Sequence, residues 1–532
     1  MFKVCPKTKK IITFKNKKKW AKLFLPIAGF FCLVWFLIRV IPKPSRIVYP
    51  CQRMAAPLAL GFTVWAAGLV GSGISYFKTK ISLRYIRLIA AAGLCAAIII
   101  AAICIPVNIA GNNSNGHSIN KIASGYTSFE KPNSPVGEPK GINPGRVTWV
   151  RDINATKYDG DGFWWDDSNT DQKVVNEMMS RSIRWLAGKQ TDKEAWDAIF
   201  KYFNRNNSGN SSGYKKGEKI VIKVNLNQDH GNEWKSQHMP SPQVVYALVD
   251  QLVNIVGVNG EDITIADASR TIGEPLYNKI HGDTNPQLQA IKFVGQNRTL
   301  PVGDMSHPIH FSGENIPDAG VPSVYVEAKY IINMALFRAH TIFGITLCGK
   351  NHFGSVYFEG LGFNPSPLHV SQWSSFGKYH CIVDLIGHSE LGGKTVLYII
   401  DGLYHSLNQE DKTIDKFASF ENGWASSIFI SQDSVAIDSV ALDFLANEPT
   451  ISIEGSSGCP DNYLIEAALA DNPPSGTLYN PNNTGRLSSL GVHEHWNNPI
   501  DKKYSGNLGT GNGIELISWD SDRNCYQLLL QF

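Results

Sequence analysis

The sequence predicts an α/β fold: a Rossmann-like parallel or mixed sheet with helices on both faces, preceded by an N-terminal helical transmembrane region. Two observations support this prediction. After residue 145, β-branched apolar runs alternate with amphipathic helical patterns, which is typical of βαβ units. Before residue 111 lie three long apolar segments, each close to the about 20 residues that cross a bilayer as a helix.

The apolar segments comprise residues 23–41, 55–76 and 88–110. Nine Lys precede the first, and four Lys or Arg lie between the second and third. Since Lys and Arg concentrate in cytoplasmic loops, three spans leave the N-terminus inside and the following domain outside the cytoplasm. Basic residues between the first two segments oppose this orientation.

Pro57 and several Gly interrupt the second segment, and if it does not span, the domain is cytoplasmic. A cleaved signal peptide is the other interpretation of the first segment, but no small-residue cleavage site follows it.

Charge is divided unevenly between the two parts. Residues 1–110 hold 17 of the 50 Lys and Arg, and all 46 Asp and Glu lie from Glu130 onward. The membrane part is therefore +17 and the remainder −13. Binding a phosphate backbone requires a basic surface, so we expect no nucleic-acid partner. The basic residues of the membrane part would contact the anionic lipids of the cytoplasmic membrane, so we expect the lipid bilayer as a partner.

A linker and one large domain follow the membrane part. Residues 111–145 are rich in Asn, Ser, Gly and Pro, which is typical of a flexible linker. Residues 146–532 form the expected soluble α/β domain, and they suffice for one large core or two lobes.

The first elements of this domain are predicted from caps and apolar patterns. The run 219–226 is mostly apolar and rich in β-branched residues, as in a buried strand. A helix begins at Ser241, with Pro at its first position, and precedes a strand at 262–266. The elements before this βαβ unit are a strand at 146–150, a helix from near Thr170, and a helix from the capping box Thr191–Glu194.

Three further strands and a helix complete the prediction. The strands cover 330–336, 395–400 and 427–431, and the helix starts at Asp433 and carries apolar residues through Phe444. Consecutive βαβ units produce a parallel sheet with helices on both faces.

Several short motifs occur in the order and spacing of a known bacterial family. They are Lys223-Val224-Asn225, Ile331-Ile332-Asn333, His340, Lys350-Asn351-His352-Phe353-Gly354, Asp401-Gly402, and Asp433 with Asp438. Over about residues 147–448 the chain resembles the family known as domain of unknown function 362. The segment 491–496 also resembles the ending of longer members. The resemblance implies an α/β fold and no defined activity.

The chain departs from the family pattern in four places. Val224, Arg338-Ala339 and Ser434 replace the usual Pro, Lys-Thr and Pro. Some members carry ferredoxin-type cysteine clusters, whereas this chain has no C-x-x-C. We therefore expect neither an iron–sulfur cluster nor a zinc ribbon. The sequence does not identify a cofactor, and a divalent metal is the one candidate. For the domain's Cys348, Cys381, Cys459 and Cys525, buried free thiols are favoured over disulfides.

Polar residues gather at the predicted ends of strands, where ligands bind in open α/β sheets. The candidate site residues are Lys223, Asn225, Asp267, His340, Lys350, Asn351 and Asp401. Lys350 and Asn351 belong to a Gly-rich stretch, 344–354, that can wrap an anion or act as a lid. In the competing interpretation, Lys223 and Asp401 form a structural ion pair and Asn225 holds a turn.

His493 and His495 are the only close histidine pair. On a strand both imidazoles share one face, as metal ligands do. A surface loop is the favoured alternative, and a third ligand would come from His230, His238, His307 or His310.

An acidic loop, 159–171, carries oxygen ligands of the kind calcium prefers. Its spacing does not fit an EF-hand, so a solvated turn that caps the next helix is favoured. The adjacent Trp164 and Trp165 are expected in the core rather than on a sugar-stacking surface.

Two functions follow from these patterns. The first is an extracytoplasmic enzyme that acts on an anionic or polyhydroxylated substrate, with lysines and His340 as binding groups and Asp267 or Asp401 as base. The second is a non-catalytic module that binds a cell-envelope polymer or a protein. Convergence of the candidate residues in one pocket favours the enzyme, whereas an exposed Trp row favours the binding module. No P-loop, G-x-S-x-G or G-x-G-x-x-G motif occurs.

Overall fold

The computed structural model describes residues 128, 130–226, 234, 237–370, 373, 375–421, 423–453 and 458–522. The chain divides into two compact units, Met1–Ser118 and Ile119–Phe532, and every described residue belongs to the second. The three expected transmembrane segments lie outside the described residues. Within the described ranges, no helix combines the length and the apolar character that crossing a bilayer requires.

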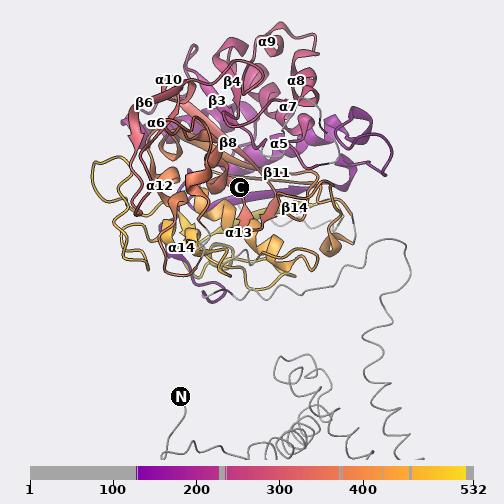
Figure 1. Cartoon of the computed structure of the whole chain (residues 1–532). Coiled ribbons are helices and arrows are strands. Elements are labelled where there is room, and N and C mark those ends of the chain that lie inside the picture. Colours follow the sequence, from indigo (N-terminus) through magenta and orange to yellow (C-terminus); the bar gives the residue numbers. More distant parts are fainter. Residues whose placement is uncertain are drawn as a thin grey trace, which may run out of the picture. The chain divides into compact units, whose positions relative to one another are not determined.

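A mixed eight-stranded sheet forms the centre of the described unit (Figure 1). In spatial order its strands are β14 (Glu515–Asp520), β2 (Arg146–Arg151), β12 (Ser427–Ser431), β11 (Thr395–Gly402), β8 (Tyr330–Leu336), β3 (Ile220–Lys223), β4 (Ile263–Ala266) and β5 (Lys292–Val294). β12 runs antiparallel to both neighbours, and every other pair is parallel. The α/β class and the mixed sheet are therefore confirmed.

Helices cover both faces of the sheet, because alternate strand residues enter two separate cores. In β3, Ile220 and Ile222 belong to one core and Val221 to the other. The first core is covered by α5 (Gln172–Ala187), α6 (Asp192–Ser208), α7 (Pro242–Asp250), α8 (Glu274–His281) and α9 (Pro286–Gln289). The second core is covered by α10 (Ser323–Glu327), α11 (Cys348–Asn351), α12 (Cys381–Gly387), α13 (Ser434–Asn447) and α14 (Asn462–Ala468). Figure 1 shows α7 and α8 on the opposite side of the sheet from α13 and α14.

The helices start where their caps predict. The Thr191 hydroxyl accepts from the Glu194 amide at the start of α6, and Asp171, the last residue of the acidic loop, accepts from the Val174 amide at the start of α5. Asp433 accepts from two amides of α13. A carboxylate at an N-cap satisfies amides that have no partner within the helix.

Part of the expected linker is folded against the domain. β1 (Val136–Gly137) pairs with β13 (Val492–His493), and both lie within the same compact unit. Gly137 has φ 84, and a Cβ there would lie 2.4 Å from the Gly491 carbonyl oxygen. Only glycine fits such a close approach with a positive φ.

Two short hairpins and a short helix complete the fold. β9 (Arg338–His340) pairs with β10 (Gly344–Thr346), and β6 (Gly303–Ile309) pairs with β7 (Ala319–Pro322). The short helix α15 (Ser505–Leu508) precedes β14.

Tryptophans and cysteines are located as expected where the structure describes them. Trp164 and Trp165 are buried. No Trp is among the exposed large apolar residues of the described ranges. Cys348, Cys381 and Cys459 are buried free thiols, and Cys525 lies outside the described residues.

Candidate functional site

A cavity of about 450 Å³ opens at the carboxyl ends of β3 and β4. Six of the seven residues predicted from the strand ends line it: Lys223, Asn225, Asp267, His340, Lys350 and Asn351. Arg270, His369, Gln409 and Glu410 are further polar lining residues. The carboxyl edge of the sheet therefore brings most of the candidate residues together.

Lys223, the last residue of β3, is fully enclosed by its partners. Its ammonium donates to the Val224 carbonyl oxygen at 2.5 Å, to Asn351 Oδ1 at 3.0 Å and to Asp267 Oδ2 at 3.3 Å. Burial lowers the pKa of Lys223, and the Asp267 carboxylate opposes this shift. An ammonium has three N–H groups, and all three are used. Lys223 therefore adds positive charge to the cavity and holds its neighbours in place. It has no free N–H to donate to a ligand.

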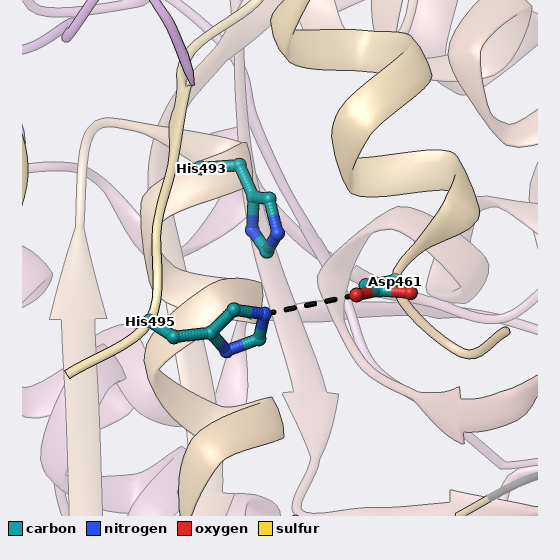
Figure 2. Close-up of side chains that lie close together, drawn as sticks. All are labelled: Asp461, His493 and His495. Atoms are coloured by element: carbon teal, nitrogen blue, oxygen red, sulfur yellow. Dashed lines mark ion pairs between the residues drawn. The ribbon is translucent and has the colours of Figure 1, made fainter. Parts of the chain in front are cut away.

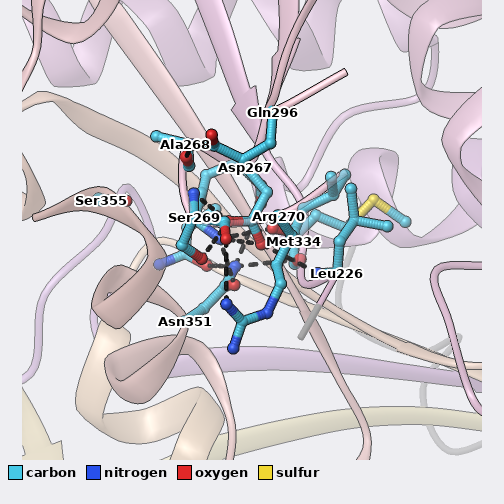
Figure 3. Close-up of polar contacts among 12 residues, drawn as sticks. Leu226, Asp267, Ala268, Ser269, Arg270, Gln296, Met334, Asn351 and Ser355 are labelled. Carbon is cyan, nitrogen blue, oxygen red and sulfur yellow. Dashed lines mark hydrogen bonds and ion pairs between the residues drawn. The ribbon is translucent and has the colours of Figure 1, made fainter. Parts of the chain in front are cut away.

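Asp267, directly after β4, is held by several donors (Figure 3). The Leu226 amide donates to Oδ2, while the amide and hydroxyl of Ser269 donate to Oδ1. A Cβ at Gly354 would lie 2.6 Å from Asp267 Oδ1 and 3.0 Å from Lys223 Nζ, so glycine is required for the backbone to pack over this pair. Both carboxylate oxygens of Asp267 thus accept hydrogen bonds from the protein itself, and its role as a base stays a prediction.

Lys350, in α11, has quite different surroundings. Its Nζ lies 4.3 Å from the ring centroid of Phe353 and 5.4 Å from that of Phe343. Within the described part of the chain, no atom accepts a hydrogen bond from it and no carboxylate pairs with it. The residue is nevertheless buried, and burial lowers the pKa of Lys350 to about 7. Near neutral pH its ammonium and amine forms are therefore both populated.

Two neutral imidazoles adjoin Lys350. His340 Nδ1 accepts from the Ile342 and Phe343 amides, so in the neutral ring the proton is on Nε2. Burial lowers the pKa of His340 well below its ordinary value, and the nearby Lys350 lowers it further. Desolvation by the surrounding protein likewise lowers the pKa of His369, although its side chain is partly open to solvent. His340 is therefore a neutral donor at its cavity-lining position.

The electrostatic balance of the cavity favours an anion. Lys223, Arg270 and Lys350 supply positive charge, and the Lys223 charge is offset by Asp267. Glu410, the other carboxylate of the lining, is exposed and accepts hydrogen bonds from Thr341 and Gln409. Lys350 therefore has no compensating negative charge in its own contacts.

Asp401 does not line this cavity. Its carboxylate accepts from the amide and hydroxyl of Ser241 and from the Leu403 amide, and burial raises its pKa to about 6. Strand side chains alternate between faces, and neighbouring Ile400 and Ile399 of β11 belong to the two different cores. Asp401 lies two residues after Ile399, so its side chain points to the same face of the sheet as Ile399, the face that α7 covers. It orders the start of that helix, and the alternative Lys223–Asp401 pair does not form.

The Gly-rich stretch is a wall of the cavity. It forms β10, α11 and the turn after it, and most of its residues are buried. Backbone amides of Cys348 and Gly349 donate to Asp438 of α13. This anchoring explains why the stretch is packed into the fold instead of forming the lid that its glycines indicated.

Sequence reasoning missed Arg270, His369 and Glu410. Arg270 follows Asp267 in the loop after β4, so the strand-end rule that selected Asp267 could have included it. His369 and Glu410 lie in long irregular loops, where no local pattern indicates which side chains reach the cavity.

The histidine pair is buried, and the expectation of a surface loop is wrong. His493, Glu494 and His495 are at most 6% exposed. Polar partners make this burial possible: Glu494 accepts from Ser505 and Ile514, and His495 pairs with Asp443. Asp461 completes a cluster with the two histidines (Figure 2). His238, His307 and His310 are not part of it, and His230 lies outside the described residues.

Comparison with known proteins places the cavity in a recognised family segment. Residues 220–443 match the model described as domain of unknown function (DUF362). The resemblance to DUF362 is confirmed over this segment. No curated protein matches the chain.

The DUF362 segment begins at the first residue of β3 and ends within α13. It contains all seven candidate residues of the strand ends. His493, His495 and Asp461 lie beyond it.

Proposed function

We propose that the chain is an enzyme whose cavity binds and transforms a small anionic or polyhydroxylated substrate. The observation that carries this proposal is Lys350, which is 9% exposed at the cavity and whose ammonium has no hydrogen-bond acceptor or carboxylate among the described residues. Desolvating an unpaired ammonium costs several kcal/mol. An anionic substrate that contacts Lys350 would offset this cost.

The lining residues have distinct roles in this proposal. Lys350 and Arg270 attract the anionic group of the substrate, while Lys223 and Asp267 hold the strand ends in place. The His340 Nε2–H donates to a substrate oxygen. Lys350, whose pKa lies near 7, exchanges a proton with the substrate, because a catalytic acid or base works best when its pKa is near the working pH.

Two observations favour an enzyme over a non-catalytic binding module. Six of the seven candidate residues share one cavity, and groups with shifted pKa values in a cavity are typical of catalytic sites. A polymer-binding surface would instead present aromatic rings to solvent. Phe163 and Phe376 are the exposed aromatic residues of the described chain, and they do not form a row of Trp.

We also propose that this enzyme is anchored in the cytoplasmic membrane with its domain outside the cytoplasm. The support is the sequence of residues 1–110, with three apolar segments and the distribution of Lys and Arg around them.

Thermal unfolding with a set of small anions tests the proposed function. Inorganic phosphate, succinate and gluconate represent a phosphate, a dicarboxylate and a polyhydroxylated anion. We expect at least one to raise the Tm of the wild-type chain by roughly 5 °C at saturating concentration. Lys350→Met should lose this increase, because it removes the only buried cation without an acceptor among the described lining residues.

Lys201→Met is the matched control, since Lys201 is half exposed on α6 and pairs with Asp197. This variant should retain the full increase in Tm. An anion that stabilises the Lys350→Met and wild-type chains equally would contradict the proposal, as would a wild-type Tm that none of the anions changes.

A further inference from the structure

The cluster of Asp461, His493 and His495 lies in a buried part of the structure outside the DUF362 segment. The two histidines come from β13 and the residues after it, and Asp461 precedes α14. One ligand atom of each residue lies within 4.8 Å of those of the other two. Figure 2 shows both imidazole rings on the side of their chain segment that faces Asp461.

His493 presents an unprotonated ring nitrogen to this cluster. The Ser439 hydroxyl donates its hydrogen to the Val435 carbonyl oxygen at 2.7 Å, so its oxygen accepts from His493 Nδ1 at 2.8 Å. Nδ1 therefore carries the proton, and Nε2 has a lone pair. His493 Nε2 is buried and has no hydrogen-bond partner. A buried acceptor without a partner is costly, and a metal ion would satisfy it.

His495 and Asp461 supply the other two ligand atoms. His495 Nδ1 contacts Asp443 Oδ1 at 2.5 Å, and its Nε2 lies 3.7 Å from Asp461 Oδ2. Two atoms bound to one zinc ion at about 2.0–2.1 Å are separated by at most about 4.2 Å, so this pair already has a suitable spacing. Histidine ligands of metals usually donate their other N–H to a carboxylate, carbonyl or similar acceptor, as both histidines do here.

We propose that Asp461, His493 and His495 form a buried structural site for a divalent transition-metal ion of the zinc class. Imidazole and carboxylate ligands suit such ions. The charges also match, because the Asp461 and Asp443 carboxylates balance a dication bound to two neutral imidazoles. The site would join the start of α14 to β13 and, through Ser439 and Asp443, to α13.

Without a metal, His495 would be an imidazolium between two carboxylates. Burial by itself lowers the pKa of His495, but Asp443 and Asp461 outweigh it and raise this pKa to about 10. Such an ion pair explains why His495 and Asp461 are buried together. It leaves His493 Nε2 without a hydrogen-bond donor, whereas a metal ion would give this nitrogen a partner.

Metal analysis of the full-length chain tests the site. After dialysis against a chelator, the wild-type chain should rebind one equivalent of Zn²⁺, and its Tm should increase on rebinding. His493→Asn should weaken Zn²⁺ binding by at least about 100-fold, since changes to second-shell residues alone cost about 10–100-fold. The Asn amide can still donate to Ser439, so the substitution removes mainly the Nε2 ligand.

His388→Asn is the matched control. His388 is equally buried, its Nδ1 accepts from the Glu390 amide, and it is outside the cluster. This variant should bind one equivalent of Zn²⁺. If His493→Asn fails to fold, Asp461→Asn and the wild-type measurements decide. A chelated wild-type chain that rebinds no Zn²⁺ would overturn the proposal, as would full Zn²⁺ affinity in a folded His493→Asn or Asp461→Asn chain.

Discussion

Lys223 and Lys350 are buried lysines of the same cavity, but their ammonium groups have different surroundings. Lys223 donates to a backbone carbonyl, an amide oxygen and a carboxylate, whereas Lys350 contacts two aromatic faces. A fully buried lysine is rare unless it is paired. The fold therefore accounts for the burial of the first lysine, and for the second we propose a bound ligand.

We predict that Lys223→Met destabilises the protein by about 3–5 kcal/mol, the typical cost of removing one partner of a buried ion pair. The loss arises because Asp267 would keep its charge in a buried position without its cation. Chemical denaturation of the wild-type and variant chains measures the free energy of unfolding. A change within the roughly 0.5 kcal/mol of ordinary surface substitutions would show that the pair is not structural.

Sequence reasoning at the residue scale identified polar strand ends but not the face to which each side chain points. Lys223 and Asp401 both end strands that are apolar on both faces, so their flanking residues do not indicate a direction. The structure directs Asp401 toward α7 and Lys223 toward the cavity. In the same way, only the positions of Ser439 and Asp443 on α13 explain the burial of His493 and His495.

At the scale of elements, the long strands and helices of the DUF362 segment were predictable. β8 and β12 have the predicted bounds, because β-branched apolar runs and N-caps are local signals. β1, β13 and β14 were not predicted. These elements are short or rich in polar residues, and β14 pairs with β2, whose position along the chain is remote. Such pairings depend on tertiary contacts that no local pattern contains.

At the scale of the whole molecule, the proposed membrane anchoring rests on the apolar segments and the division of charge along the sequence. We predict that a reporter active only outside the cytoplasm is active when fused after Gly145, because three spans with a basic inner side place this point outside. A cytoplasmic reporter fused at Gly145 should be inactive. The opposite pair of results would exclude the proposed orientation and favour two spans.

The pH dependence of lysine labelling tests the central claim, an unpaired Lys350 amine in an anion-binding cavity, most directly. Trace acetylation of the full-length chain is measured for each lysine by mass spectrometry over a pH series from about 5 to 11. Only the neutral amine reacts, and the pKa of Lys350 is about 7. Labelling of Lys350 should therefore rise with a midpoint near pH 7, several units below the about 10.4 of a lysine in a model peptide, and a stabilising anion should move this midpoint upward. A Lys350 midpoint near the about 10.4 of a lysine in a model peptide, unchanged by any anion that stabilises the chain, would contradict the account.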